Sequence, residues 1–273
     1  MIISFVNQKG GVGKTTAAIN LAASLKRKNY NVAFVDADPQ GSATTWHSIE
    51  NNNIFEIMHY PEPVSKSDIG ALSQDYDYLV IDAPPGIGDI AKSVLSVSDL
   101  SIIPLSPSSL DIWSCKGTLE MIDEAQQENP DLDVKLLINR KIPGTRVGRE
   151  AREALAIFNK EILDTEICQR VAYIDAMASG VSVMQYAPSS KAALEIENLC
   201  DELTFQEVEA ASEMQVEMEP ELQVEAESEM HVEAESEMQV EAESEVQVEE
   251  EPEVQEPYSY AESAGGYDDR RLW

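Results

Sequence analysis

Cysteine is scarce in this chain of 273 residues, and the three that occur, Cys115, Cys168 and Cys200, lie far apart. No C-x-x-C pair is present, which argues against an iron–sulfur cluster or a zinc site. Isolated cysteines of this kind are typical of proteins kept in a reducing cytosol. The cysteine pattern therefore argues strongly against an electron carrier built on a bound cluster.

Long apolar runs are also missing, since none approaches the roughly 18 residues that a bilayer-spanning helix needs. The first residues lack a cationic stretch followed by an apolar one, so we expect no secretory signal. A basic amphipathic helix for membrane attachment is not evident either, because the stretch EIENLCDELTF is acidic. These absences predict a soluble, cytoplasmic protein with no membrane partner.

Positive charge is in short supply, and the deficit is uneven along the chain. The formal net charge is -32; residues 1–205 carry 17 basic and 28 acidic side chains, and residues 206–273 carry 2 and 23. The first segment thus has a net charge of -11 and the second of -21. Most of the acidity belongs to the second segment and says little about what the first one binds.

An eight-residue unit repeats near the end of the chain, over about residues 215–254. Glutamate occupies every second position within each of its five copies, which begin at Gln215, Gln223, His231, Gln239 and Gln247. Pairing such segments as strands would set like charges opposite each other, and their small apolar side chains could not offset the entropy of ordering. We therefore predict that residues 206–273 form a disordered, acidic, low-complexity tail.

Apolar runs alternate with helical patterns throughout residues 1–205. Five runs rich in valine, isoleucine and leucine predict strands: IISFVN, NVAFVD, YDYLVID, LSIIPL and VKLLIN. Near-continuous apolar strands are typical of a parallel sheet that is covered on both faces. The alternation predicts a doubly wound α/β domain, with a mostly parallel sheet and helices on both faces.

The segment QKGGVGKTT, residues 8–16, stands between the first predicted strand and the first predicted helix. Glycine-rich backbone N–H groups in that position bind phosphates, and the predicted contacts are Gly10, Gly11, Val12, Gly13, Lys14, Thr15 and Thr16. Lys14 would neutralise the β- and γ-phosphates, and the Thr15 hydroxyl would bind Mg²⁺. Two residues depart from the usual phosphate-binding loop: Gln8 replaces a glycine, and Lys9 adds a second lysine.

Aspartates follow two other predicted strands. VDADPQGS places Asp36 and Asp38 at the end of one strand, and VIDAPPG places Asp82 at the end of another. Ligands of open α/β sheets bind at the carboxyl ends of the strands. A single aspartate there is as readily explained by a turn or a helix cap, but three strand ends with related chemistry indicate one nucleotide site.

Together, KGGVGKTT, VDADPQGS and VIDAPPG resemble the deviant Walker motifs of the ParA/MinD ATPases. The resemblance covers about residues 1–205, and PLSPSSLD and LINRKI are most similar to the small plasmid-partition proteins of ParF type and the carboxysome-positioning proteins of McdA type. It implies a P-loop ATPase with ATP and Mg²⁺ as cofactors. It also implies an ATP-bound homodimer in which Lys9 reaches the phosphates of the partner, as an arginine finger does.

The resemblance assigns roles to the remaining site residues. The implied catalytic residues are Lys9, Lys14 and Asp38, the last of which orients or activates the attacking water. The implied ligands of hydrated Mg²⁺ are Thr15, Asp36 and Asp82. The residues themselves leave open the exchanged assignment of Asp36 and Asp38.

The segment from Lys135 to Arg152 carries two further predictions. Asn139 is a candidate adenine contact, although an ordinary loop asparagine fits the sequence as well. Six cations in this segment stand against one acid, and the resemblance implies non-specific DNA binding through Arg140, Lys141, Arg146, Arg149 and Arg152. A solvated helix face is the alternative, and a net charge of -11 opposes DNA binding.

We therefore expect a cytoplasmic, nucleoid-associated partition ATPase. Its ATP-bound dimer would bind DNA, and a small adaptor or centromere-binding protein would stimulate its slow hydrolysis and release it. The expected cargo is a plasmid or a chromosome. The alternatives are positioning of a carboxysome by the same mechanism and a metabolic ligase on the same P-loop fold.

Overall fold

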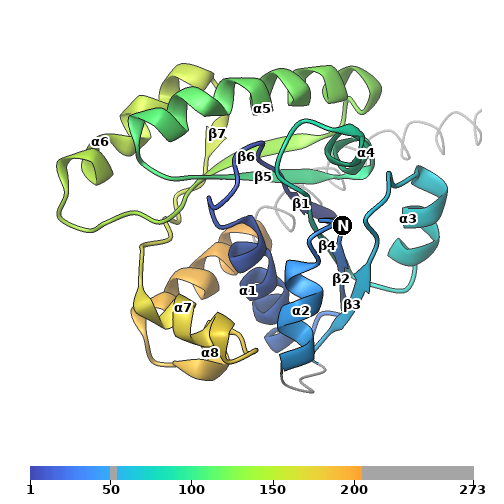
Figure 1. Ribbon diagram of the computed structural model, residues 1–273, viewed down its shortest axis with the longest axis horizontal. Coiled ribbons are helices and arrows are strands. Elements are labelled where there is room, and N and C mark those ends of the chain that lie inside the picture. Colours follow the sequence, from blue (N-terminus) through green and yellow to red (C-terminus); the bar gives the residue numbers. More distant parts are fainter. Residues whose placement is uncertain (50–53, 205–273) are drawn as a thin grey trace, which may run out of the picture. The chain divides into compact units, whose positions relative to one another are not determined.

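A computed structural model describes residues 1–49 and 54–204 (Figure 1). The predicted tail, residues 206–273 with its repeats, lies outside the described residues. The strands are β1 (Ile2–Phe5), β2 (Val32–Asp36), β3 (Glu56–His59), β4 (Tyr78–Asp82), β5 (Leu100–Leu105), β6 (Asp133–Ile138) and β7 (Glu161–Ile162). They form a seven-stranded sheet in the order β3-β2-β4-β1-β5-β6-β7.

Helices follow most of the strands. They are α1 (Lys14–Arg27), α2 (Ser42–Ile49), α3 (Lys66–Ser73), α4 (Asp89–Val97), α5 (Ser109–Glu128), α6 (Arg146–Leu155), α7 (Val171–Ala178) and α8 (Val183–Tyr186), with a 3₁₀ turn, η1 (Ala156–Phe158). Residues 191–204 form one more helix. Within the described part of the chain, no helix is both long and apolar enough to cross a membrane.

The predicted fold class is confirmed, because every strand pair of the sheet is parallel and helices cover both faces. All five predicted strands form. The sequence did not indicate β3 or β7, for a physical reason. Both lie at the sheet edges; β3 is only partly buried and β7 has two residues, so neither shows a continuous apolar run.

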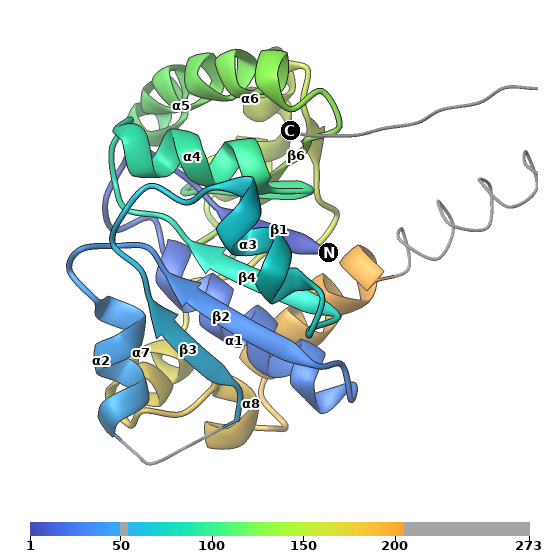
Figure 2. The same cartoon turned by 90° about the vertical axis from the view of Figure 1, so that its right-hand side faces the viewer.

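Helices lie on both sides of the sheet (Figure 2), and one apolar cluster of buried side chains covers each face. One joins alternate strand residues, such as Phe5 and Phe34, to α1, α2, α7, α8 and the helix 191–204. The other joins the intervening residues, such as Val35 and Ile81, to α3, α4, α5 and α6. Burial on both faces explains why these strands read as unbroken apolar runs.

The strand register brings the loops of the site together. Phe5 of β1 and Asp36 of β2 are both opposite Asp82 of β4, so three neighbouring strands end at the same level. The phosphate loop therefore leaves the sheet from β1, beside the end of β4 with Asp82, and the end of β2 with Asp36 lies one strand further on. This is the edge at which open parallel sheets bind ligands.

Candidate nucleotide-binding site

The loop between β1 and α1 has the backbone geometry of a phosphate cradle. Gly13 is the N-cap of α1 and has a φ of 92°, in the left-handed region. A Cβ at this position would lie 2.5 Å from the amide nitrogen of Asn139, so a larger residue would both strain and clash. The N-terminus of α1, with its free N–H groups and positive dipole end, begins at the next residue.

Gln8, which replaces the expected glycine, is held by α5. Its backbone N–H donates to the Thr118 hydroxyl at 3.1 Å, and its side-chain amide donates to the Ser114 carbonyl. A Cβ on Gly117 would lie 2.6 Å from the Gln8 amide oxygen, so α5 needs glycine opposite this side chain. Contacts with α5 thus position the first half of the loop. In the usual motif a flexible glycine occupies the place of Gln8.

Lys14 is buried, and its ammonium lies within the loop. It donates to the carbonyl of Asn7 at 3.1 Å and to the carbonyl of Lys9 at 3.3 Å. Burial lowers the pKa of Lys14, while the nearby Asp82 and Asp38 carboxylates act in the opposite direction. Among the described residues, the hydrogen-bond partners of Lys14 are carbonyl oxygens, and a buried cation of this kind is suited to a bound phosphate anion.

The residues beneath the loop fit a magnesium ion. The Thr15 hydroxyl donates to one oxygen of Asp82 at 2.5 Å, and the Thr44 backbone and hydroxyl donate to one oxygen of Asp36 at 2.8 and 2.9 Å. The second oxygen of each aspartate is buried and accepts no hydrogen bond from the described residues. Mg²⁺ prefers carboxylate and hydroxyl oxygens, so Thr15, Asp36 and Asp82 are the residues that would hold it.

Asp82 should make stability depend on pH. Burial raises its pKa to about 7, although the Thr15 hydrogen bond and Lys14 oppose the shift. Between about pH 4 and pH 7 the carboxyl is ionised in the unfolded chain and protonated in the folded chain. The free energy of unfolding therefore falls by roughly 1.4 kcal/mol for each unit by which the pH rises in this range. Above pH 7 both forms are ionised and the loss stops growing.

We therefore expect Asp82→Asn to stabilise the nucleotide-free protein, in chelator, by an amount that grows from pH 4.5 to pH 7 and is constant above. Urea unfolding of both proteins across this range measures the difference. A difference that stays constant with pH would contradict the buried, protonated state of Asp82.

Asp38 differs from Asp36 in its surroundings. Asp36 is fully buried beside Asp82, whereas Asp38 lines the open pocket and accepts a hydrogen bond from the Gln40 backbone N–H at 2.9 Å. The buried position is suited to the metal side, and the position at the pocket is suited to a water molecule. This contrast supports the assignment of Asp38 to the attacking water and Asp36 to Mg²⁺.

Lys9 points to a group of its own chain. Its ammonium forms an ion pair with the carboxylate of Asp111, in the first turn of α5. The Lys9 side chain is 40% exposed and that of Asp111 is 11% exposed. Lys9 thus lies at the rim of the phosphate loop, whereas Lys14 is enclosed by it.

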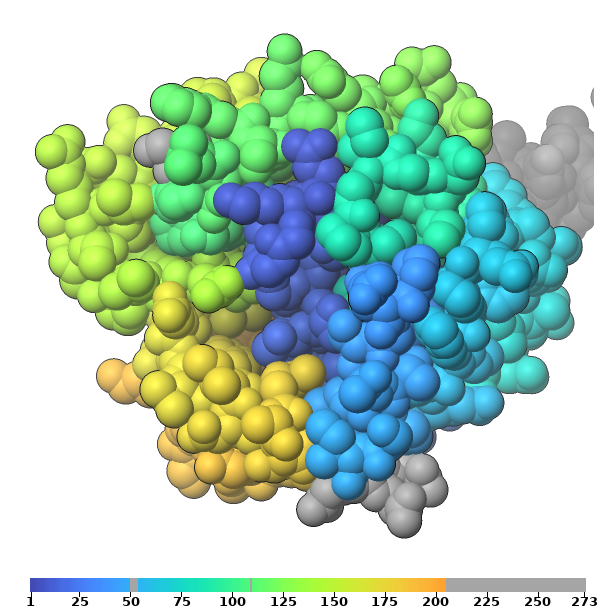
Figure 3. All heavy atoms as spheres, viewed as in Figure 1, coloured from blue at the N-terminus to red at the C-terminus, as the bar shows by residue number. Residues whose placement is uncertain are grey.

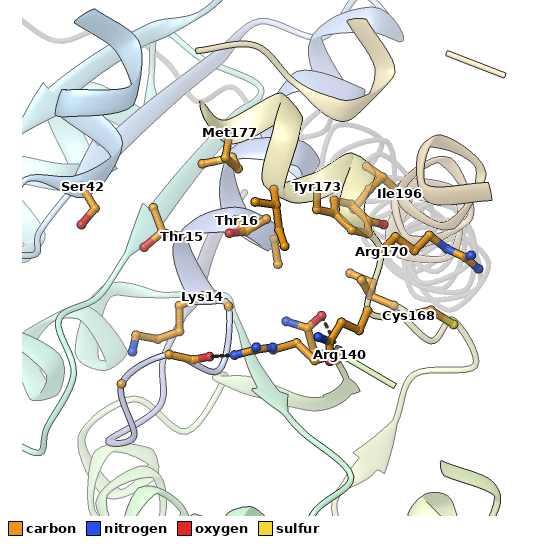
Figure 4. A pocket seen from close by; sticks show the side chains of 18 of the residues that line it. Lys14, Thr15, Thr16, Ser42, Arg140, Cys168, Arg170, Tyr173, Met177 and Ile196 are labelled. Atoms are coloured by element: carbon orange, nitrogen blue, oxygen red, sulfur yellow. Dashed lines mark hydrogen bonds between the residues drawn. The ribbon is translucent and has the colours of Figure 1, made fainter. Parts of the chain in front are cut away.

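A pocket of about 550 Å³ extends from the phosphate loop along α1 (Figure 4). One end is formed by the loop, with Lys14, Thr15 and Thr16. The other end is formed by residues that the sequence analysis missed: Ile167, Cys168, Gln169, Arg170, Tyr173, Ile174, Met177 and Ile196. In the space-filling view the dark-blue N-terminal segment reaches the surface between the green, light-blue and yellow segments (Figure 3).

Asn139 lines this pocket, but its amide is already engaged. The amide nitrogen donates to the Val12 carbonyl at 2.7 Å, and the amide oxygen accepts from the Arg140 backbone N–H at 2.8 Å. The Arg140 side chain donates to the Gly11 carbonyl at 2.6 Å. Both residues after β6 therefore support the phosphate loop, and the adenine contact predicted for Asn139 stays a prediction.

The five basic residues predicted to bind DNA are only partly free of partners. Lys135, the sixth cation of the segment, is buried in β6. Lys141 pairs with Glu166 and Arg146 with Glu150, while Arg152 donates to three carbonyls, those of Ile162 at the end of β7 and of the next two residues. Arg149 donates only to the carbonyl of Gly144, at 2.9 Å, and has no acidic partner among the described residues.

Fold and site together define a P-loop nucleotide-binding protein of the deviant Walker kind. The chain belongs to the family of CobQ/CobB/MinD/ParA nucleotide binding domains, whose sequence profile matches residues 3–183. The resemblance predicted from the three motifs is therefore confirmed.

Named relatives agree with this membership. The chain is 31% identical over 206 residues to the maintenance of carboxysome distribution protein A of Halothiobacillus neapolitanus, covering 74% of this chain and 95% of that protein. It is 27% identical over 241 residues to the chromosome-partitioning ATPase Soj of Thermus thermophilus, covering 76% and 97%.

Solved structures share the fold. Apo McdA from Cyanthece has a TM-score of 0.63 at 19% identity and covers 74% of this chain and 98% of its own. Cobyrinic acid a,c-diamide synthase from Mycobacterium smegmatis, with a bound ATP analog and magnesium, has a TM-score of 0.62 at 22% identity and covers 73% and 92%. The same fold is thus found in McdA and in a synthase.

Proposed function

We propose that this chain is a cytoplasmic ATPase that positions or partitions a cargo, with ATP and Mg²⁺ as cofactors and an ATP-bound homodimer as its active form. The observation that carries the proposal is the pair of lysines in one phosphate loop. Lys14 is buried within the loop, whereas Lys9 stands at the exposed rim and pairs with Asp111. A cation at the rim is accessible to a second copy, and we propose that it completes the site of that copy.

The residues of the chain divide the reaction between them. Backbone N–H groups of the loop and the Lys14 ammonium bind and orient the phosphates. Asp38 orients the attacking water and accepts its proton, and Lys9 of the partner copy stabilises the charge on the phosphoryl group. Thr15, Asp36 and Asp82 would hold Mg²⁺, which would supply positive charge to the phosphates.

Dimerisation then depends on nucleotide state. A lysine that reaches the terminal phosphate from the second copy loses its target once that phosphate leaves, so hydrolysis separates the copies. Sedimentation velocity tests this directly: the protein should sediment as a dimer with Mg²⁺ and a non-hydrolysable ATP analogue, and as a monomer with ADP. The exposed position of Lys9 at the rim, outside the site that Lys14 occupies, favours this switch over a metabolic ligase, which needs no second copy at its phosphates.

For the cargo, we propose a plasmid or chromosome, with an adaptor protein that stimulates hydrolysis. The name of the Thermus relative, a chromosome-partitioning ATPase, supports this cargo. A second candidate is a carboxysome-like protein compartment, which is supported by 31% identity over 95% of a carboxysome distribution protein. Both cargoes use the same nucleotide switch.

Non-specific DNA binding by the ATP-bound dimer is part of the proposal, and Arg149 is the residue that tests it. Arg149→Ala should weaken ATP-dependent binding to duplex DNA several-fold at low salt. Because the dimer would lose two phosphate contacts, the slope of log affinity against log salt should fall by about 2. Fluorescence anisotropy with two unrelated duplexes measures both quantities.

The matched control is Lys92→Ala, since Lys92 is an exposed helix cation that pairs with Glu124 on the neighbouring α5. This variant should bind DNA as the unmodified protein does. Equal losses of DNA affinity in both variants would indicate a general charge effect. Unchanged affinity in the Arg149 variant would contradict DNA binding through α6.

A further inference from the structure

The end of the pocket away from the phosphate loop is built on a short extended segment, residues 167–169. This segment pairs with the residues after β6: the Lys141 N–H donates to the Ile167 carbonyl at 3.0 Å, and the Gln169 N–H donates to the Lys141 carbonyl at 2.8 Å. The adjacent Asn139 and Arg140 hold the phosphate loop. The segment 139–141 after β6 therefore contacts both ends of the pocket, the phosphate loop and residues 167–169.

One carboxylate braces this end from behind. Glu195, on the helix 191–204, accepts from the Arg170 guanidinium at 2.9 and 2.5 Å, from the Cys168 backbone N–H at 3.2 Å and from the Tyr173 hydroxyl at 3.2 Å. Its side chain is 14% exposed. The Arg170 guanidinium and the Cys168 backbone thus depend on a single acid that the next helix supplies. The Tyr173 hydroxyl lies between this acid and the Ala192 carbonyl, which is nearer, at 2.9 Å.

The lining at this end has the character of a site for a flat, mostly apolar group. Ile174, Met177 and Ile196 line it together with the Tyr173 ring (Figure 4). Since the phosphates occupy the loop at the opposite end, the base of the nucleotide is the part that would extend here. Lys14 and Arg140 lie toward the phosphate side in the same view.

We infer that Glu195 is a positioning residue for the nucleobase: it holds residues 168–173 in the conformation that receives the base, without contacting the phosphates. The inference rests on nucleotide binding, as the proposed function does. It adds that the helix 191–204, which shows none of the nucleotide motifs, decides how strongly the base contributes to affinity. A preorganised wall improves affinity because binding need not order it.

The same helix offers a matched control. Glu197, two residues further on, also pairs with an arginine, Arg27 at the far end of α1, at 2.9 Å. That pair does not line the pocket. Glu195→Ala and Glu197→Ala therefore remove the same side chain from the same helix, and only the first one disturbs the pocket wall.

Isothermal titration calorimetry with two probes, Mg²⁺–ADP and inorganic tripolyphosphate, tests the inference. Glu195→Ala should weaken ADP binding about tenfold, as expected for loss of charged hydrogen bonds, and change tripolyphosphate binding less than twofold. Glu197→Ala should change neither. Arg170→Ala should resemble Glu195→Ala, and the double variant should lose little more than either single one.

Equal weakening of both probes in Glu195→Ala would show a general structural role and overturn the inference, as would unchanged ADP affinity. If Glu195→Ala unfolds, Glu195→Gln keeps the shape and removes the charge, and the same ratio of the two affinities decides. A failure of the proposed function looks different. In that case the unmodified protein would stay monomeric with ATP, while the ADP-to-tripolyphosphate ratio would still respond to Glu195.

Discussion

Lys9→Ala should abolish ATP-dependent dimerisation while nucleotide binding by the monomer changes little. Within one chain, the Lys9 ammonium contacts Asp111, and the enclosed Lys14 serves the phosphates. In a dimer of the Lys9→Ala protein, each copy would lack one desolvated contact between the Lys9 ammonium and a phosphate of the partner. Removing one partner of such a contact costs about 2 kcal/mol or more, and two symmetric contacts correspond to roughly a thousandfold weaker dimer.

Sedimentation velocity with Mg²⁺ and a non-hydrolysable ATP analogue measures this loss, and titration with a fluorescent nucleotide verifies that the monomer still binds. A Lys9→Ala protein that dimerises as the unmodified protein does would end the proposal of a shared site. A loss of nucleotide binding in the monomer would instead indicate that Lys9 serves its own phosphates.

Asp111→Asn is the complementary variant, because it removes the charge that retains Lys9 within its own chain. Dimerisation should then require less ATP. Trp113, in the same helix turn, offers a reporter, since it is 71% exposed while Trp46 is buried. With Trp273→Phe as background, a blue shift of emission on addition of ATP would report that a second copy covers this turn.

Asp38→Asn should lower the rate of ATP hydrolysis by at least a hundredfold and leave the ATP-bound dimer intact. Asn has nearly the same shape and cannot accept a proton from the attacking water, and general base catalysis typically contributes 10²- to 10⁴-fold. The dimer should accumulate with ATP itself, without an analogue. Phosphate release and sedimentation of the same samples measure both effects.

Asp36→Asn separates the two possible assignments of the aspartate pair. Asp36 lies beside Asp82, and one of its oxygens is buried and accepts no hydrogen bond from the described residues. Loss of this carboxylate should weaken Mg²⁺ binding, and excess Mg²⁺ should restore part of the hydrolysis. Hydrolysis by Asp38→Asn should not respond to Mg²⁺. The exchanged pattern, with rescue only in the Asp38 variant, would reverse the assignment.

The two sets of variants act on opposite steps of one cycle. Without Lys9 the copies should not join, and without Asp38 they should not separate. A cargo-positioning switch needs both steps, so either variant alone should leave the cargo unevenly distributed. The Lys9 variant should leave the protein free, and the Asp38 variant should leave it bound.

The sequence by itself determined the five inner strands of the sheet, the phosphate loop and the strand-end aspartates. Each of these depends on neighbouring residues: a run of buried apolar side chains, a glycine at positive φ before Lys14, an aspartate directly after a strand. Parallel strands that end at one level then place Asp36, Asp82 and the loop together without further information. The edge strands β3 and β7 were not predicted, because the partial burial of β3 and the short length of β7 leave no continuous apolar run in the sequence.

Only the tertiary structure decided which partner each site residue has. Gln8 lies against Gly117, Lys9 pairs with Asp111, and Glu195 braces the wall at Cys168 and Arg170, all across long separations in sequence. Such contacts depend on how α5 and the helix 191–204 dock on the sheet, and docking is set by the packing of whole apolar faces. Local periodicity shows that a helix has an apolar face, but not which polar residue that helix will present to the loop beside it.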